Sequence, residues 1–236
     1  MQNASMTDAA SERLSRLLSH SAHEVRNSLS VALGYTGFVL RDKKVKVSDQ
    51  HRQWLELAQK ACGKLAELAN EMSDLAKLES GDAGLVRTAT DLRALLAGAI
   101  AALPVAERDH NIDIELSTGD GPAMVDADTS RLRKAFGAVL VALRQAALPG
   151  IKFRVEERSK DDTGRRISWI VMGDAEQVEA LRHATADALV TFDPSVGNTG
   201  ISLWTAVWVL NAHGGVIWSP VDKTKPAAVI MLPLRS

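Results

Sequence analysis

Apolar residues recur at helical spacing through the first third of the chain. One row occupies Leu18, Ala22, Val25, Leu29, Ala32, Thr36 and Val39, and a second, beyond the charged segment RDKKVKVSDQ, occupies Trp54, Ala58, Ala61, Leu65, Leu68, Met72 and Leu75. Both rows advance by four and three residues in alternation, which is the spacing of a helix that packs along its whole length. The pattern predicts two long helices joined by a short polar turn, that is, a helical hairpin.

A hairpin of two helices leaves part of each apolar stripe uncovered, because each helix covers only one side of the other. Two hairpins together bury both stripes as a four-helix bundle. We therefore expect a homodimer formed through residues 10–80.

The pattern changes after the segment ESGDAG, residues 79–84, whose glycines favour a helix end and a joint. Beyond it, helices are expected at 91–102, 129–147 and 203–212. Strands are expected at 112–116 and in the segments KFRVEER, RISWIVM, VIWSP and AVIMLPL. The sequence thus predicts an α+β chain: residues 1–82 form the hairpin of a dimeric four-helix bundle, and residues 83–236 form an α/β sandwich with helices on one face of a sheet.

Composition narrows the classes of function. The 236 residues carry a net charge of −1, which disfavours a nucleic-acid partner. Cys62 is the single cysteine, so neither an intrachain disulfide nor a cysteine-based metal site is expected. The N-terminal segment has no apolar core typical of a signal peptide, and no run approaches the roughly 18 apolar residues of a membrane span. We therefore expect a cytoplasmic protein without a membrane partner.

A polar island, SHSAHEVRNSLSVALGY, lies within the first helix between Ser19 and Tyr35, beside the apolar row and without interrupting it. His23, Glu24 and Asn27 are spaced so that they share an exposed flank of that helix, beside the packed row. The simplest interpretation is a solvated face of an amphipathic helix, and His20 fits that interpretation.

The segment H-E-x-x-N-S-L, from His23 to Leu29, resembles the phospho-acceptor box of bacterial sensor histidine kinases. The resemblance continues through LAKLESG at the end of the second helix, DLRALLAGAI, VDADTSRLRKAF and NTGISLWTAVWVLNAHGGVIW, so it covers nearly the whole chain. It implies that His23 accepts a phosphoryl group, that Glu24 orients its ring, and that Asn27 orients a hydrolytic water. An imidazole suits this chemistry because its pKa lies near neutrality.

The resemblance also implies a Bergerat or GHKL-type ATPase-like second domain, but the nucleotide motifs are degenerate. Ala138 and Ala142 stand where the family has asparagines, one of which holds magnesium on the phosphates. Asp174 matches the aspartate that recognises adenine, without the glycines that follow it in the family. The alternative is that Asp174 caps the helix that begins there.

The third nucleotide motif is a glycine loop before a helix, whose amides hold phosphates in the family. Gly197, Thr199 and Gly200 match it, while Ser202 replaces a usual glycine. Together the substitutions predict weak nucleotide binding and little autokinase activity, so no cofactor and no resident metal is expected.

These observations favour a dimeric histidine phosphotransfer protein of a two-component phosphorelay, in which His23 accepts phosphate from one receiver-domain aspartate and donates it to another. Two alternatives remain open. One is a soluble autophosphorylating histidine kinase with an atypical site for ATP and magnesium. The other is a pseudokinase that regulates a response regulator by binding alone.

Overall fold

The chain forms two compact units, residues 1–84 and 85–236, in a computed structural model. The structure describes residues 2–42, 44, 46–79, 84–103, 113–148, 150–162, 165–182, 186–195 and 200–235. The division falls two residues beyond the boundary expected from the sequence. None of the helices in the described ranges combines the length and apolar composition needed to cross a bilayer.

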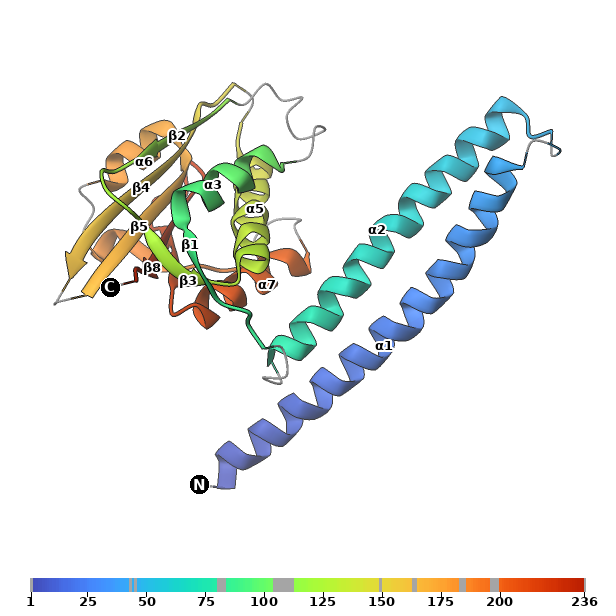
Figure 1. Ribbon diagram of the computed structural model, residues 1–236, viewed down its shortest axis with the longest axis horizontal. Coiled ribbons are helices and arrows are strands. Elements are labelled where there is room, and N and C mark those ends of the chain that lie inside the picture. The colour runs from blue at the N-terminus through green and yellow to red at the C-terminus, as the bar shows by residue number, and fades with distance from the viewer. Residues whose placement is uncertain are drawn as a thin grey trace. The chain divides into compact units, whose positions relative to one another are not determined.

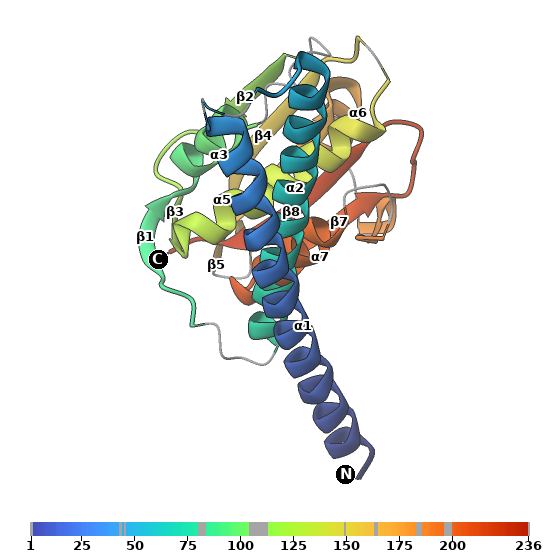
Figure 2. The same ribbon diagram turned by 90° about the vertical axis from the view of Figure 1, so that its right-hand side faces the viewer.

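The first unit is an antiparallel hairpin of two long helices, α1 (Gln2–Arg41) and α2 (Asp49–Glu79), which lie side by side in both views (Figures 1 and 2). The connection is short and polar. The backbone N–H of Lys44 donates to Asp42, and the Ser48 hydroxyl accepts from the N–H of His51 at the start of α2. The long hairpin predicted from the 4-3 spacing is therefore confirmed.

The row of α2 that faces α1 is displaced by one residue from the apolar row read in the sequence. It consists of the less exposed positions Leu55, Gln59, Cys62, Ala66, Ala69, Ser73 and Ala76. Ala69 and Ala76 are only 2% and 1% exposed, and Ala22 of α1 is fully buried. These small side chains let the two helices approach closely, while the larger Trp54, Leu65 and Leu68 remain exposed.

The second unit contains a six-stranded sheet in the order β2-β4-β5-β8-β7-β6 and a two-stranded ribbon, β1-β3. Its elements in chain order are β1 (Thr88–Asp91), α3 (Leu92–Ala101), β2 (Ile114–Thr118), β3 (Met124–Ala127), α5 (Thr129–Ala146), β4 (Phe153–Asp162), β5 (Arg165–Asp174), α6 (Ala175–Leu181), a 3-10 turn (Ala186–Ala188), β6 (Leu189–Thr191), α7 (Ile201–Ala212), β7 (Val216–Pro220) and β8 (Ala227–Pro233). Only β2 and β4 pair in parallel; the other neighbours in the sheet are antiparallel.

Aspartate caps set the starts of two helices that cover this sheet. Asp91 accepts a hydrogen bond from the N–H of Arg93 at the start of α3, and Asp128 accepts one from the N–H of Arg131 in α5. Such caps satisfy amide groups that have no partner within the helix. Three helices, α3, α5 and α7, lie against one face of the sheet (Figure 1).

The core lies between this helical layer and the sheet. Its fully buried large side chains include Leu92 and Leu96 of α3, Leu132, Phe136 and Leu140 of α5, Leu210 of α7, and Ile170 and Met172 of β5. The core also contains Glu157 of β4, which is completely buried and paired with Arg93 of α3 at 2.9 Å. Removing either partner would leave the other charge partly or wholly desolvated and unpaired, so the pair ties α3 to the sheet.

Side chains at alternate positions of the strands form the opposite, outer face of the sheet. Glu156 and Arg158 of β4 belong to this face because they alternate with the inward-facing Val155 and Glu157. The short helix α6 contacts the same face, since its Glu179 pairs with Arg154 of β4. The helices therefore lie on both faces of the sheet, whereas the sequence predicted helices on one face only.

Candidate functional site

The polar island lies on a continuous stretch of α1. Its only fully buried member is Ala22, which faces α2, whereas His23, Glu24 and Asn27 are exposed. A hydrogen bond of 2.8 Å from Nε of Arg26 to Oδ1 of Asn70 joins this turn of α1 to α2. Nothing in the sequence distinguishes Asn70, because its role depends on which residues of α2 face α1.

The ring of His23 has one nitrogen beside a polar partner. Nδ2 of Asn27 lies 3.2 Å from Nδ1 of His23, one helical turn away. Rotating the Asn27 amide by half a turn would bring Oδ1 to this position, where it accepts from an Nδ1–H and leaves the lone pair on Nε2. Within the described part of the chain, Nε2 of His23 has no hydrogen-bond partner, so it is free to meet an incoming group.

Glu24 pairs with His20 and not with His23. Its Oε1 lies 3.3 Å from Nε2 of His20, and both side chains are about three-quarters exposed, at 70% and 75%. An exposed pair of this kind contributes about 0–1 kcal/mol to stability, so it does not lock either side chain in place. The structure thus brings Asn27 to His23, while the assistance of Glu24 at the ring stays a prediction.

Ser28, which follows Asn27 in the polar island, is compatible with an unbroken helix. Its hydroxyl donates to the carbonyl oxygen of Glu24 at 3.1 Å. A proline at this position would clash with that carbonyl group and remove a backbone donor. The absence of proline agrees with a helix that runs unbroken from residue 2 to residue 41.

The two positions of α5 that the resemblance matches to magnesium-binding asparagines carry methyl groups. Ala138 and Ala142 are half-buried on α5 and offer no oxygen or nitrogen ligand. Among the described residues there is no group of three His, Cys, Asp or Glu side chains arranged to hold a metal ion. Oxygen ligands are what magnesium requires, so this face of α5 does not fit the ion.

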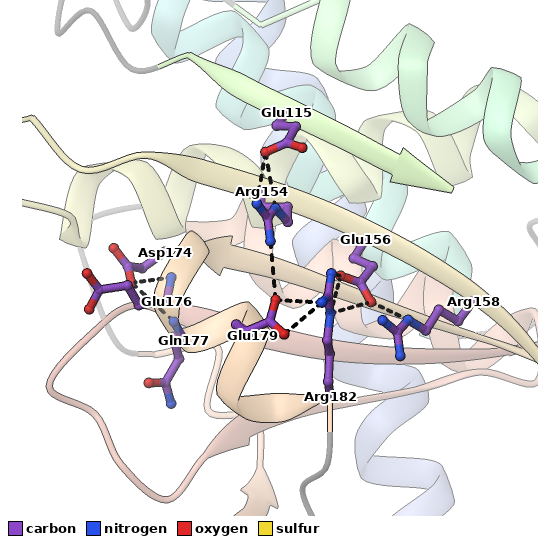
Figure 3. Close-up of polar contacts among 9 residues, drawn as sticks. All are labelled: Glu115, Arg154, Glu156, Arg158, Asp174, Glu176, Gln177, Glu179 and Arg182. Atoms are coloured by element: carbon purple, nitrogen blue, oxygen red, sulfur yellow. Dashed lines mark hydrogen bonds and ion pairs between the residues drawn. The ribbon is translucent and has the colours of Figure 1, made fainter. Parts of the chain in front are cut away.

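Asp174 caps α6 through one of its two carboxylate oxygens. Its Oδ1 accepts hydrogen bonds from the N–H groups of Glu176, at 3.0 Å, and Gln177, at 3.2 Å (Figure 3). Nζ of Lys225 lies 3.7 Å from the same oxygen, and the Asp174 residue is only 5% exposed. The structure therefore shows the helix cap, while adenine recognition by Asp174 stays a prediction.

The glycine loop is only partly described. Gly200 is the N-cap residue of α7 with a φ of 63°, a conformation that glycine adopts without strain, and glycine has no side chain that could cap the helix. Gly197 and Thr199 lie outside the described residues. A phosphate-binding role for these three residues therefore stays a prediction.

His213 is a structural residue. It is buried at the end of α7, where Nδ1 contacts the carbonyl oxygen of Val209 at 2.7 Å and Nε2 accepts from the N–H of Asp128 at 2.9 Å. Burial lowers the pKa of His213 below its usual range, so its ring is neutral at pH 7. This ring joins the end of α7 to the start of α5.

Residues 13–81 match the His Kinase A (phospho-acceptor) domain, which places the hairpin and its polar island in a known family of domains. The chain is 25% identical over 222 residues to the sensor protein GacS of Pseudomonas syringae pv. syringae, covering 91% of this chain and 24% of that protein. The chain thus spans about a quarter of the length of this curated relative.

Two solved structures share the fold. Full-length ShkA in complex with AMPPNP matches 93% of this chain and 45% of its own with a TM-score of 0.69 and 17% identity. The histidine kinase AdeS of Acinetobacter baumannii matches 90% of this chain and 96% of its own with a TM-score of 0.53 and 16% identity. Both matches extend over the hairpin and the mixed α/β unit.

Proposed function

We propose that this chain acts as a histidine phosphotransfer protein. It belongs to the sensor histidine kinase family, with the phospho-acceptor hairpin followed by a GHKL-like domain. In this role His23 receives a phosphoryl group from an aspartyl phosphate of one receiver domain and passes it to the aspartate of another. The observation that supports the proposal is a contrast: Asn27 lies beside the ring of His23, whereas Ala138 and Ala142 offer no metal ligand and Oδ1 of Asp174 already accepts two backbone hydrogen bonds.

The transfer uses Nε2 of His23 as the nucleophile. Its lone pair forms a P–N bond as the P–O bond of the aspartyl phosphate breaks, and the aspartate leaves as a carboxylate. The imidazole then carries the positive charge or releases the Nδ1 proton. Asn27 holds Nδ1 at 3.2 Å, which supports the tautomer with its lone pair on the exposed nitrogen when the amide oxygen faces the ring.

The loss of the magnesium ligands supports a receiver as the phosphate source. Phosphoryl transfer from ATP depends on metal ions that neutralise charge on the phosphates. Ala138 and Ala142 supply no ligand, and the Asp174 carboxylate already accepts two backbone hydrogen bonds. A charge-assisted hydrogen bond contributes roughly 1.5–3 kcal/mol, so each lost contact weakens nucleotide binding by about 10- to 150-fold.

Exposed apolar side chains support a homodimer through the hairpin. Trp54, Leu65 and Leu68 of α2 are 55%, 49% and 37% exposed, and they belong to the apolar row that does not face α1. A second hairpin would cover this row as a four-helix bundle. The dimer would leave the flank that carries His23 open to a receiver domain.

The proposal is tested by mixing the full chain with a receiver domain that carries labelled aspartyl phosphate. We expect label to move to the wild type and not to a His23→Gln variant. His20→Gln is the matched control, because this exposed histidine lies one turn away on the same flank and should leave transfer intact. Retention of all label on the receiver would contradict the proposal, and release as inorganic phosphate would indicate a phosphatase instead.

A second candidate function is autophosphorylation from ATP, favoured by two observations. ShkA, whose fold this chain shares, was solved with AMPPNP, and Gly200 places a backbone turn without a side-chain cap at the start of α7. Incubation with labelled ATP and magnesium tests it. Label on the wild type that is absent from His23→Gln would establish a kinase with an atypical nucleotide site.

A further inference from the structure

A hollow of about 540 Å³ lies on the outer face of the sheet in the second unit. Its floor is made by Trp169 and Val171 of β5, Val229 of β8 and Trp218 of β7, and Leu181 at the end of α6 forms part of one wall. The volume is within the range typical of sites for small molecules. Neither the phosphotransfer chemistry at His23 nor the degenerate nucleotide positions use these residues.

The floor of the hollow is an aromatic platform. The indole rings of Trp169 and Trp218 are stacked with their centroids 5.6 Å apart and an angle of 16° between their planes. Both residues are half-buried, and β8 lies between their strands in the sheet. Flat, offset stacking is a favoured arrangement of aromatic rings, so the pair presents a surface on which a further planar ring can stack.

The rim of the hollow is basic. Arg158 and Lys160 of β4 and Arg182 after α6 line it, and the only acid among the lining residues is Glu156. The Glu156 side chain is 4% exposed and pairs with both Arg158 and Arg182, the latter at 2.7 Å (Figure 3). Arg182 is also paired with Glu179, which lies outside the hollow, so the excess of positive charge at the rim comes from Arg158 and Lys160.

The arginines at this rim are held in place before any ligand arrives. Figure 3 shows Arg182 between Glu156 and Glu179, and its guanidinium lies 2.6 Å from a carboxylate oxygen of Glu179. Arg158 is anchored by Glu156, yet half of its side chain is exposed. Groups held in a binding arrangement lose little conformational freedom on binding, which favours affinity.

The hollow is separate from the nucleotide positions inherited from the family. Ala138 and Ala142 lie on α5, which packs against the inner face of the sheet, whereas Arg158, Trp169 and Trp218 project from the outer face. The hollow contains none of the residues proposed to transfer phosphate. The two activities can be tested apart.

We infer that this hollow binds a small planar aromatic anion. The aromatic ring stacks on the Trp169 and Trp218 platform, and a phosphate or carboxylate group on the ligand meets Arg158 and Lys160. Nucleotides and aromatic carboxylates share this chemistry. A neutral aromatic molecule lacks the charge that the rim complements, and inorganic phosphate lacks the ring.

Isothermal titration of the full chain tests the inference with two probes, GMP and indole-3-acetate, which represent the two ligand sources. We expect saturable binding of one probe or both at one molecule per chain, at least tenfold tighter than guanosine or inorganic phosphate. Lack of saturable binding by both probes, or equally tight binding of guanosine, would overturn the inference.

Substitutions then locate the binding. The double variant Arg158→Gln/Lys160→Gln should bind the tighter of the two probes about tenfold or more weakly than the wild type, because charged hydrogen bonds are lost. Lys160→Gln alone should weaken it about threefold without disturbing Glu156. Trp218→Leu should abolish binding, whereas Trp204→Leu, which changes a tryptophan 51% exposed on α7, should leave it unchanged. Unchanged affinity in both rim variants would contradict this location.

Discussion

Replacing Leu65 and Leu68 by glutamine should dissociate the expected dimer without unfolding the hairpin. The two side chains are 49% and 37% exposed in the single chain, so only that fraction of each remains to be buried by a partner. Fully burying a leucine contributes roughly 1.5–3 kcal/mol, which gives about 0.7–1.5 kcal/mol for Leu65 and about 0.6–1.1 kcal/mol for Leu68. Glutamine has nearly the same helix propensity as leucine, so α2 itself should persist.

Two-fold symmetry doubles the effect, because each substitution occurs in both protomers. The loss is then roughly 2.6–5.2 kcal/mol per dimer, or about 70- to 5,000-fold in the dissociation constant. Sedimentation equilibrium over a range of concentrations measures that constant. The matched control is Lys60→Gln with Glu67→Gln, two exposed residues on the polar side of the same helix. An equal change of the dissociation constant in the Leu65 and Leu68 variant and in the control would show that these leucines do not lie in the dimer interface.

Three further predictions concern stability. The pKa of His213 lies below its ordinary 6.5, so the unfolded chain takes up a proton at this residue before the folded chain does. The free energy of unfolding should therefore fall as the pH drops through about 6.5 and stop falling below the lowered pKa. Urea titrations at several pH values should show a shallower decline for His213→Gln. Asp174→Ala should cost about 0.5–2 kcal/mol in urea unfolding through loss of the α6 cap, with phosphotransfer to His23 unaffected; a loss of transfer in a folded variant would contradict the capping role. Gly173→Ala should destabilise the chain by about 2 kcal/mol or more, because Gly173 has a φ of 151° and a Cβ there would lie 2.4 Å from the Pro226 carbonyl oxygen. An unchanged melting temperature would contradict this close contact.

The hairpin could be predicted from the sequence because a 4-3 alternation persists over many turns of each helix. The row of α2 that contacts α1 could not be predicted, since α2 carries two such rows side by side. The buried one contains Ala66, Ala69, Ser73 and Ala76, which look less hydrophobic than Leu65 and Leu68 one position earlier. Close helix approach favours small residues, and hydrophobicity alone does not reveal this preference.

The second unit was predictable where its elements were long. The expected ends agree with the structure within two residues for helices α5 and α7 and strands β5, β7 and β8, whereas β4 continues four residues beyond its expected end. Strands β1, β3 and β6 are three or four residues long and have too little periodicity to detect. The aromatic platform was not predictable either. Trp169 and Trp218 meet only because β5 and β7 both flank β8, and such pairing is a property of the whole sheet.

The candidate site was predictable as a set of positions but not as a set of contacts. His23 and Asn27 could be placed on one flank from their spacing, and the structure brings them together at 3.2 Å. The pairing of Glu24 with His20 depends on rotamers that spacing does not determine. The helix cap at Asp174 likewise depends on the positions of the Glu176 and Gln177 amides, which the sequence alone does not give.

The central claim is that the phosphate on His23 comes from a receiver domain and not from ATP. One preparation of the full chain, divided between labelled receiver phosphate and labelled ATP with magnesium, tests it most directly when the initial rates of labelling at His23 are compared. We expect rapid labelling from the receiver, none from ATP, and none from either donor in His23→Gln. Labelling of His23 from ATP, or no labelling from the receiver, would contradict the proposed source of the phosphate.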